Sequence, residues 1–143
     1  MTTRLLMGLL IFAVLAWPAE QERAVGDSEV REAVSPNYEP LAVQGHISGV
    51  VEIVVDVNEA GTVSSAEIRS GHVLLRGVSL EAARQWKFDN ASGHRRLTLT
   101  FVFRLVGPDS AEKSRVVFKP PYTVEVSERP PSPTVNYGDN QRR

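Results

Sequence analysis

The chain has 143 residues, with 16 Lys and Arg against 17 Asp and Glu, so its formal net charge is −1. That length fits one domain with tails, and the near-neutral charge argues against nucleic acid as a partner, because phosphate binding needs a cationic excess. The sequence contains no cysteine, which excludes disulfides, thiolate nucleophiles and zinc ribbons.

Residues 1–19 have the pattern of a secretory signal. Arg4 precedes an almost wholly apolar run from Leu5 to Trp17, and Ala19 follows. A helix of that length spans about 20 Å, which is short of the roughly 30 Å hydrocarbon core of a bilayer. We therefore expect residues 1–19 to be a signal peptide or a short uncleaved N-terminal anchor, with membrane contact only through this segment.

The next stretch, residues 20–37, is polar and charged without a sustained period, which is typical of a flexible linker. A sharper pattern begins at Tyr38 and indicates a domain over residues 38–127. Val50 to Val57 alternates apolar and polar residues, as a half-buried strand does. Residues 58–61 end in a glycine, and Thr62 to Ser70 alternates again, so the two runs predict a β-hairpin.

The period changes to that of a helix over Leu74 to Trp86, where apolar residues recur every three or four positions. Leu97 to Leu105 returns to strict alternation and predicts a third strand. Residues 115–118 and 122–126 resemble a further strand interrupted by two prolines, which should lie at an edge or break in two. Residues 128–143 are rich in proline and polar residues and predict a disordered tail.

These elements predict an α+β fold. The order strand, strand, helix, strand fits a small antiparallel β-sheet, with an extra edge strand, covered on one face by a helix. The apolar side of the helix and the row from Leu97 to Leu105 would form the core, and Trp86 would be its largest side chain.

The chain shows no pattern of catalytic or metal-binding residues. The three histidines lie far apart in the sequence, and none has a potential ligand at metal-site spacing. Ser70 and Ser92 lack the glycines of a nucleophile elbow. Glu52 and Asp56 would stand about 13 Å apart on one strand face, which is wide for a carboxylate pair and typical of a solvated sheet face. We therefore expect no enzymatic activity, metal or cofactor, and instead a protein that binds another.

Several short motifs follow one another between residues 38 and 105. They comprise a start in which Glu39 separates Tyr from Pro before a strand, a Val-Asp hairpin with glycine, a Ser-Gly-His-x-Leu-Leu stretch, a helix ending Ala-x-x-x-Trp-x-Phe, and a closing Phe-x-Leu strand. The residues are Tyr38, Pro40, Ala42, Gly49 and Val51; Val55, Asp56 and Gly61; Ser70, Gly71, His72, Leu74 and Leu75; Ala82, Trp86 and Phe88; and Phe103 and Leu105. Over this span the chain resembles the C-terminal domain of TonB-type energy transducers.

The resemblance implies a bacterial periplasmic module of α+β fold that contacts outer-membrane receptors. In that family a strand pairs with a short receptor segment, so an exposed sheet edge supplies main-chain hydrogen bonds. The edge implied here is Leu97–Leu105 or the segment after it, with partner-binding residues Thr98, Thr100, Val102 and Arg104. If residues 115–126 cover that edge, docking requires their displacement. An exposed edge also permits a homodimer.

The chain departs from the transducers outside this span. Leu5–Trp17 contains no histidine, residues 18–37 are not a long Pro-rich spacer, and Arg76 replaces the usual acid before the helix. We therefore expect a module of the periplasm or cell envelope, exported or anchored in the inner membrane, that assists TonB-dependent transmembrane transport. The alternative is a stand-alone exported adaptor of the same fold that binds an unrelated envelope protein without energy transduction.

Overall fold

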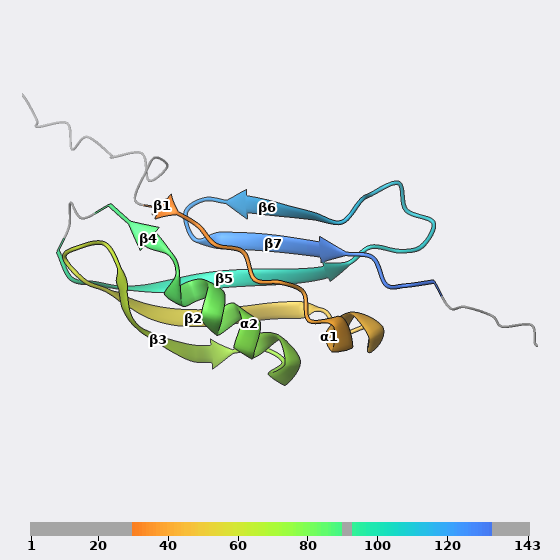
Figure 1. The fold of residues 1–143 in the computed structure, drawn as a ribbon, viewed down its shortest axis with the longest axis horizontal. Helices are drawn as coiled ribbons and strands as arrows, with labels where there is room; N and C mark the ends of the chain where they lie inside the picture. The colour runs from red at the N-terminus through yellow and green to blue at the C-terminus, as the bar shows by residue number, and fades with distance from the viewer. Residues whose placement is uncertain (1–29, 90–92, 133–143) are drawn as a thin grey trace, which may run out of the picture.

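A computed structural model describes residues 30–89 and 93–132 of the chain. The predicted signal segment, residues 20–29 of the predicted linker and residues 133–143 of the predicted tail lie outside the described residues. Within them the elements are β1 (Val30–Glu32), α1 (Pro40–Gln44), β2 (Gly49–Val57), β3 (Val63–Ser70), α2 (Val73–Arg84), β4 (Lys87–Phe88), β5 (Arg95–Leu105), β6 (Arg115–Lys119) and β7 (Thr123–Glu128) (Figure 1). Among these residues no helix is long and apolar enough to cross a membrane.

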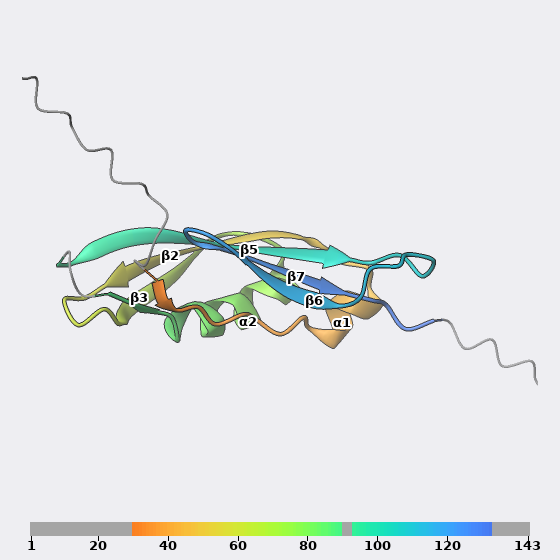
Figure 2. The same cartoon turned by 90° about the horizontal axis from the view of Figure 1, so that it is seen from above.

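The main sheet has five strands in the order β3-β2-β5-β7-β6. Figure 2 shows both helices on one face of this sheet, with the other face open. The predicted α+β fold with a helix across one sheet face is therefore confirmed. The sheet is mixed rather than purely antiparallel, however, because β7 runs parallel to β5, with Thr100 to Leu105 beside Thr123 to Glu128.

The last two strands explain why the sheet is mixed. The predicted strand breaks in two around the cis Pro120–Pro121 bond, and β6 and β7 pair as an antiparallel hairpin. β7 takes the inner place against β5, so its residues 124–127 are buried, whereas β6 is the outer strand and is mostly exposed. Val124 and Val126 there stand opposite Phe101 and Phe103.

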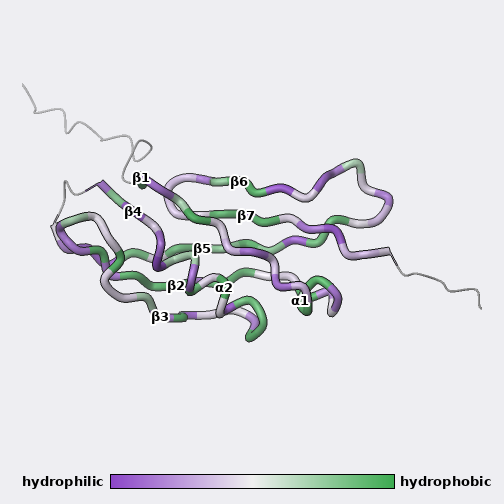
Figure 3. The backbone as a smooth tube through the Cα atoms, viewed as in Figure 1, coloured by the Kyte–Doolittle hydropathy of each residue, from purple (hydrophilic) through white to green (hydrophobic). Residues whose placement is uncertain are grey.

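Strand alternation places one row of side chains in the core. In β2 the buried residues are Val51, Ile53, Val55 and Val57, and Figure 3 shows the matching hydrophobic stretches along the strands. The central strands β2 and β5 pair over their full apolar length, from Gly49 opposite Phe103 to Val57 opposite Arg95. The resulting apolar face provides the surface on which α2 packs.

Helix α2 begins at Val73 and is capped by the residue before it. The Nδ1 atom of His72 accepts a hydrogen bond from the Leu74 amide at 3.3 Å, which satisfies one of the unpaired donors at the start of the helix. Leu75, Ala82 and Ala83 are buried against the sheet. The two small alanines allow the helix backbone to approach the strands closely.

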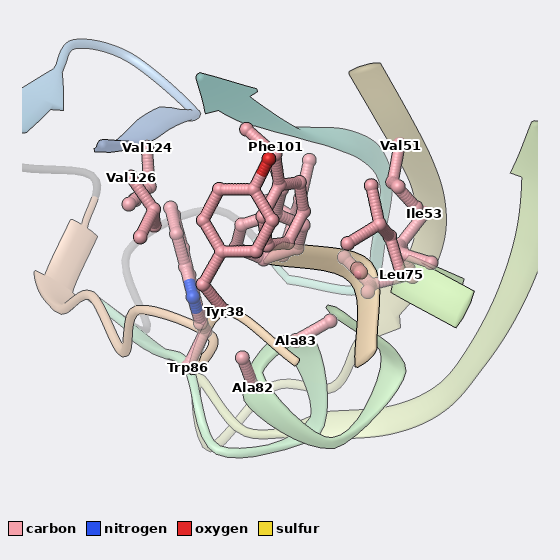
Figure 4. Close-up of a cluster of buried hydrophobic side chains, with 14 of the residues drawn as sticks. Tyr38, Val51, Ile53, Leu75, Ala82, Ala83, Trp86, Phe101, Val124 and Val126 are labelled. Atoms are coloured by element: carbon pink, nitrogen blue, oxygen red, sulfur yellow. The ribbon is translucent and has the colours of Figure 1, made fainter. Parts of the chain in front are cut away.

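Trp86 follows α2 and is the largest side chain of the core, as predicted (Figure 4). Its ring meets that of Phe101 edge to face, with 6.1 Å between centroids, and that of Phe118 from β6 at 6.0 Å. Its indole Nε1 donates a hydrogen bond to the Val34 carbonyl at 2.8 Å. The core therefore joins α2, β5, the C-terminal hairpin and the segment before α1.

Residues 30–37, which the sequence analysis placed in the linker, lie against the folded part of the chain. β1 pairs antiparallel with β4, and Val34 packs on the core. Tyr38 is buried, and its hydroxyl donates to the Ile47 carbonyl at 2.6 Å. At the other end, Arg129 follows β7 and donates to the Pro108, Ser110 and Glu112 carbonyls, so ordered contacts extend beyond residue 127.

Candidate protein-binding edges of the sheet

The structure corrects the assignment of three of the four predicted partner-binding residues to a sheet edge. β5 pairs with β2 along one side, and β7 covers the other side from Thr100 to Leu105, so Thr100, Val102 and Arg104 lie between two strands. Thr98 precedes the part of β5 that pairs with β7, and no strand among the described residues pairs with that side of it. Because they alternate with the buried core row, Thr98, Thr100, Val102 and Arg104 point to the open face of the sheet. The first three are half-buried, and Arg104 is exposed.

The outer strands of the five-stranded sheet are β3 and β6. In the part of the chain that the structure describes, no strand pairs with the outer side of either. Each carries exposed apolar side chains on the helix-covered side of the sheet: Ile68 on β3 is 42% exposed, and Val116 and Phe118 on β6 are 55% and 42% exposed. Backbone groups on such edges can pair with an added strand.

A network of exposed ion pairs covers the open face near β3. Arg96 contacts Asp56 at 3.3 Å and Glu67 at 3.2 Å, and Arg69 contacts Glu52 at 3.8 Å. Exposed pairs of this kind add little stability. Glu52 and Asp56 thus form part of a solvated sheet face, as their spacing predicts.

A second charged cluster links the last three strands of the sheet. Glu125 on β7 accepts from Lys119 on β6 and from Arg104 on β5, the latter at 3.0 Å. Its side chain is only 6% exposed although it points to the open face, since the two cationic side chains lie over it. These hydrogen bonds, that from Lys119 first, lower the pKa of Glu125, and Glu125 in turn raises the pKa of Arg104. The cluster therefore fastens the β6–β7 hairpin to β5.

A shallow open groove of about 250 Å³ lies on the helix-covered side of the hairpin. Ser35, Asn37 and Tyr38 line one wall, and residues from the start of β6 and the end of β7, including Val116 and Glu128, line the other. The groove thus adjoins the free β6 edge, where it offers space for side chains of an added strand.

The described residues include no cluster of metal-ligating side chains. No group of three His, Asp or Glu side chains among them stands close enough to hold a metal ion. His72 has a structural role as the cap of α2, and His46 lies in the turn after α1 with a φ of 53°.

Two free strand edges, a groove beside one of them and a polar open face define a small protein-interaction module. The family model for the Gram-negative bacterial TonB protein C-terminal matches residues 34–105, half of the chain. The chain therefore belongs to the TonB C-terminal family, whose domains are periplasmic protein-interaction modules. A comparison with curated proteins finds no match.

The family match ends at Leu105, which is also the last residue of β5. The β6–β7 hairpin therefore lies outside the matched region and adds two strands to it. Sequence reasoning identified these segments as strands but did not place β7 beside β5. The available signal was the alternation of Val124, Glu125 and Val126, which puts two valines on the core side.

Proposed function

We propose that the chain acts in the periplasm by pairing one edge of its sheet with an extended segment of an outer-membrane receptor, and so assists TonB-dependent transport. The observation that carries the proposal is the family fold together with two strand edges that have no pairing strand among the described residues. Pairing at an edge needs no new fold in the module, because the backbone groups already point outward.

The second candidate is a stand-alone exported adaptor that binds an unrelated envelope protein without energy transduction. The occupied edge of β5 favours it. On β5 the resemblance implies receptor docking, yet β7 already pairs there over Thr100–Leu105 and buries Val124 and Val126. Because β7 already uses these backbone groups of β5, a partner is expected to bind another surface of the module.

Thr98, Thr100, Val102 and Arg104 remain a proposed contact surface. A partner lying across the open face would meet their side chains directly. Pairing with the backbone of β5 over Thr100–Leu105 would require β7 to leave, which breaks the hydrogen bond from Arg104 to Glu125.

Photocrosslinking in cells distinguishes the two candidates. A crosslinking amino acid is placed in turn at Glu67 on β3, Thr100 on β5 and Val117 on β6. The transport role predicts crosslinks to outer-membrane receptors from at least one position. Crosslinks only to a soluble or inner-membrane protein would support the adaptor and refute the transport role.

We further propose that residues 1–19 direct export, either as a cleaved signal or as an inner-membrane anchor. Cell fractionation with N-terminal sequencing separates these outcomes. A soluble periplasmic protein that has lost its first residues indicates cleavage, a membrane-bound protein that begins at Met1 indicates the anchor, and an intact protein in the cytoplasm would refute export.

A further inference from the structure

The free edge of β6 carries cationic side chains on one face and apolar side chains on the other. Val116 and Phe118 stand opposite Val126 and Val124, so they point to the helix-covered side. Arg115 and Lys119 therefore point to the open side, with Val117 between them. Exposed apolar residues on an outer strand favour pairing with another chain, because the edge already presents unpaired backbone groups.

The groove gives this edge a place for a partner's side chains. Val116 lies on β6 and also lines the groove of about 250 Å³. A strand added beside β6 would run about 4.8 Å away, and its residue next to Val116 would point to the same side of the sheet. Alternate apolar side chains of that strand would therefore sit at the groove and beside Phe118.

A second copy of this chain is a poor occupant of the edge. If two β6 strands paired antiparallel with full overlap about Val117, Arg115 of one copy would stand opposite Lys119 of the other. Like charges directly opposite each other across a ladder are destabilising. The same positions favour an acidic partner.

Neighbouring carboxylates neutralise Arg115 and Lys119 of β6 only in part, so both can still attract an acidic partner. Arg115 contacts Glu112 at 3.3 Å, but both side chains are about half-exposed, so this pair is weak and exchangeable. Lys119 and Arg104 share the single carboxylate of Glu125, which leaves that cluster with a net charge of +1.

We propose that β6 binds an extended segment of a partner protein in which acidic residues alternate with apolar ones. The acidic residues lie opposite Arg115 and Lys119 on the open side, and the apolar residues lie opposite Val116 and Phe118 at the groove. This inference rests on the proposed function and deepens it by naming the edge and the chemistry of the bound segment.

Peptide titration of the full chain tests the chemistry. The probe is an end-capped eight-residue peptide of alternating Glu and Val, and its control has Lys in place of Glu. The expected result is that the Glu peptide shifts the backbone amide signals of residues 115–119 in NMR spectra, more strongly at low salt, and that the Lys peptide does not. Equal binding of both peptides, shifts confined to β3, no shifts, or concentration-dependent self-pairing of β6 would each overturn the proposal.

Matched edge variants separate this inference from the proposed function. Val116→Glu places a negative charge on the apolar side of β6, and Ile68→Glu does the same on β3, where the side chain has similar exposure. Val116→Glu removes an apolar contact and repels the Glu peptide, so it should weaken binding by about tenfold or more, and Ile68→Glu should leave binding unchanged. If a receptor crosslink survives Val116→Glu but is lost with Ile68→Glu, the proposed function stands and the assignment to β6 is wrong.

Discussion

Trp86 joins parts of the chain that are distant in sequence. Its ring contacts Phe101 and Phe118 edge to face, and its Nε1 reaches the Val34 carbonyl. Edge-to-face contacts of this kind are the preferred geometry of aromatic pairs. The side chain of Trp86 thus contacts the N-terminal segment, the central sheet and the C-terminal hairpin at once.

Replacing Trp86 with Ala should lower the free energy of unfolding by about 3–5 kcal/mol, because it leaves a cavity in the centre of the core. Trp86→Phe retains an aromatic ring but leaves the Val34 carbonyl without its donor, which should cost about 1–3 kcal/mol. Urea denaturation followed by circular dichroism measures both. An alanine variant as stable as the parent would contradict the central place of Trp86.

Gly71 lies where β3 turns into α2, at a position that accepts only glycine. Its φ is +127°, and a Cβ atom there would stand 2.7 Å from Val51 Cγ2 and 3.0 Å from Val51 Cα. We expect Gly71→Ala to destabilise the fold by about 1–3 kcal/mol. The control is Gly77→Ala in α2, where a Cβ meets nothing within 4 Å and should stabilise by about 0.5–1 kcal/mol. Thermal unfolding should therefore move in opposite directions for the two variants.

At the scale of elements, the joint between β5 and β7 is the feature that distinguishes this sheet. It combines apolar contacts on the helix-covered side with the Glu125 cluster on the open side. The apolar part does not depend on pH, whereas the charged part does. Acid should therefore weaken the contact between β5 and β7 by protonating Glu125.

Because the pKa of Glu125 is lowered from 4.5 in the folded chain, its carboxylate stabilises the fold fully above that value. The contribution is lost as the pH falls below 4.5 toward the lowered pKa. Glu125→Gln should therefore be less stable than the parent at pH 7, and the difference should shrink between about pH 5 and pH 3. Urea midpoints across this range provide the measurement.

The control for this variant is Glu112→Gln, which removes an exposed ion pair with Arg115 and a smaller attraction to Arg104 but keeps the hydrogen bonds of Glu125. Its stability should stay close to that of the parent at every pH. A gap between Glu125→Gln and the parent that remains constant from pH 7 to pH 3 would show that the ionised carboxylate does not support the hairpin.

Local patterns sufficed to predict β2, β3, α2 and β5, because each has an apolar repeat of clear period. They did not predict β1 and β4, which are very short and depend on each other for pairing. They also missed the place of β7. The alternation around Glu125 predicts a strand, but which strand it joins is decided by tertiary contacts with Phe101 and Phe103.

At the scale of the whole molecule, the family-matched region and the hairpin share one core. Val124 and Val126 are 2% and 5% exposed, and both belong to the same hydrophobic cluster as Trp86 and Phe101. The matched region ends at residue 105, so the core extends beyond it. The hairpin is part of the folded unit rather than an appendage.

A chain that ends after Gly107 should therefore lose stability. Burial of two valines contributes about 3–6 kcal/mol at 1.5–3 kcal/mol each, and the truncation also exposes the edge of β5. A chain that ends at Ser132 retains every described contact and should unfold at the same urea concentration as the full chain. Equal stability of the two truncated chains would show that the matched region folds independently of the hairpin.

The parallel pairing of β5 with β7 also has a consequence for the order of folding. Parallel neighbours cannot be joined by a tight turn, and here residues 106–122, including β6, form the connection. The pairs β2–β3 and β2–β5 can form once residue 105 has been synthesised, whereas β7 can dock only after residue 128 exists. In a chain that emerges N-terminus first, whether from the ribosome or across the membrane during the proposed export, the outer side of β5 therefore stays open until the last strand arrives. Such a partly emerged chain presents the Thr100–Leu105 edge that β7 covers in the finished molecule.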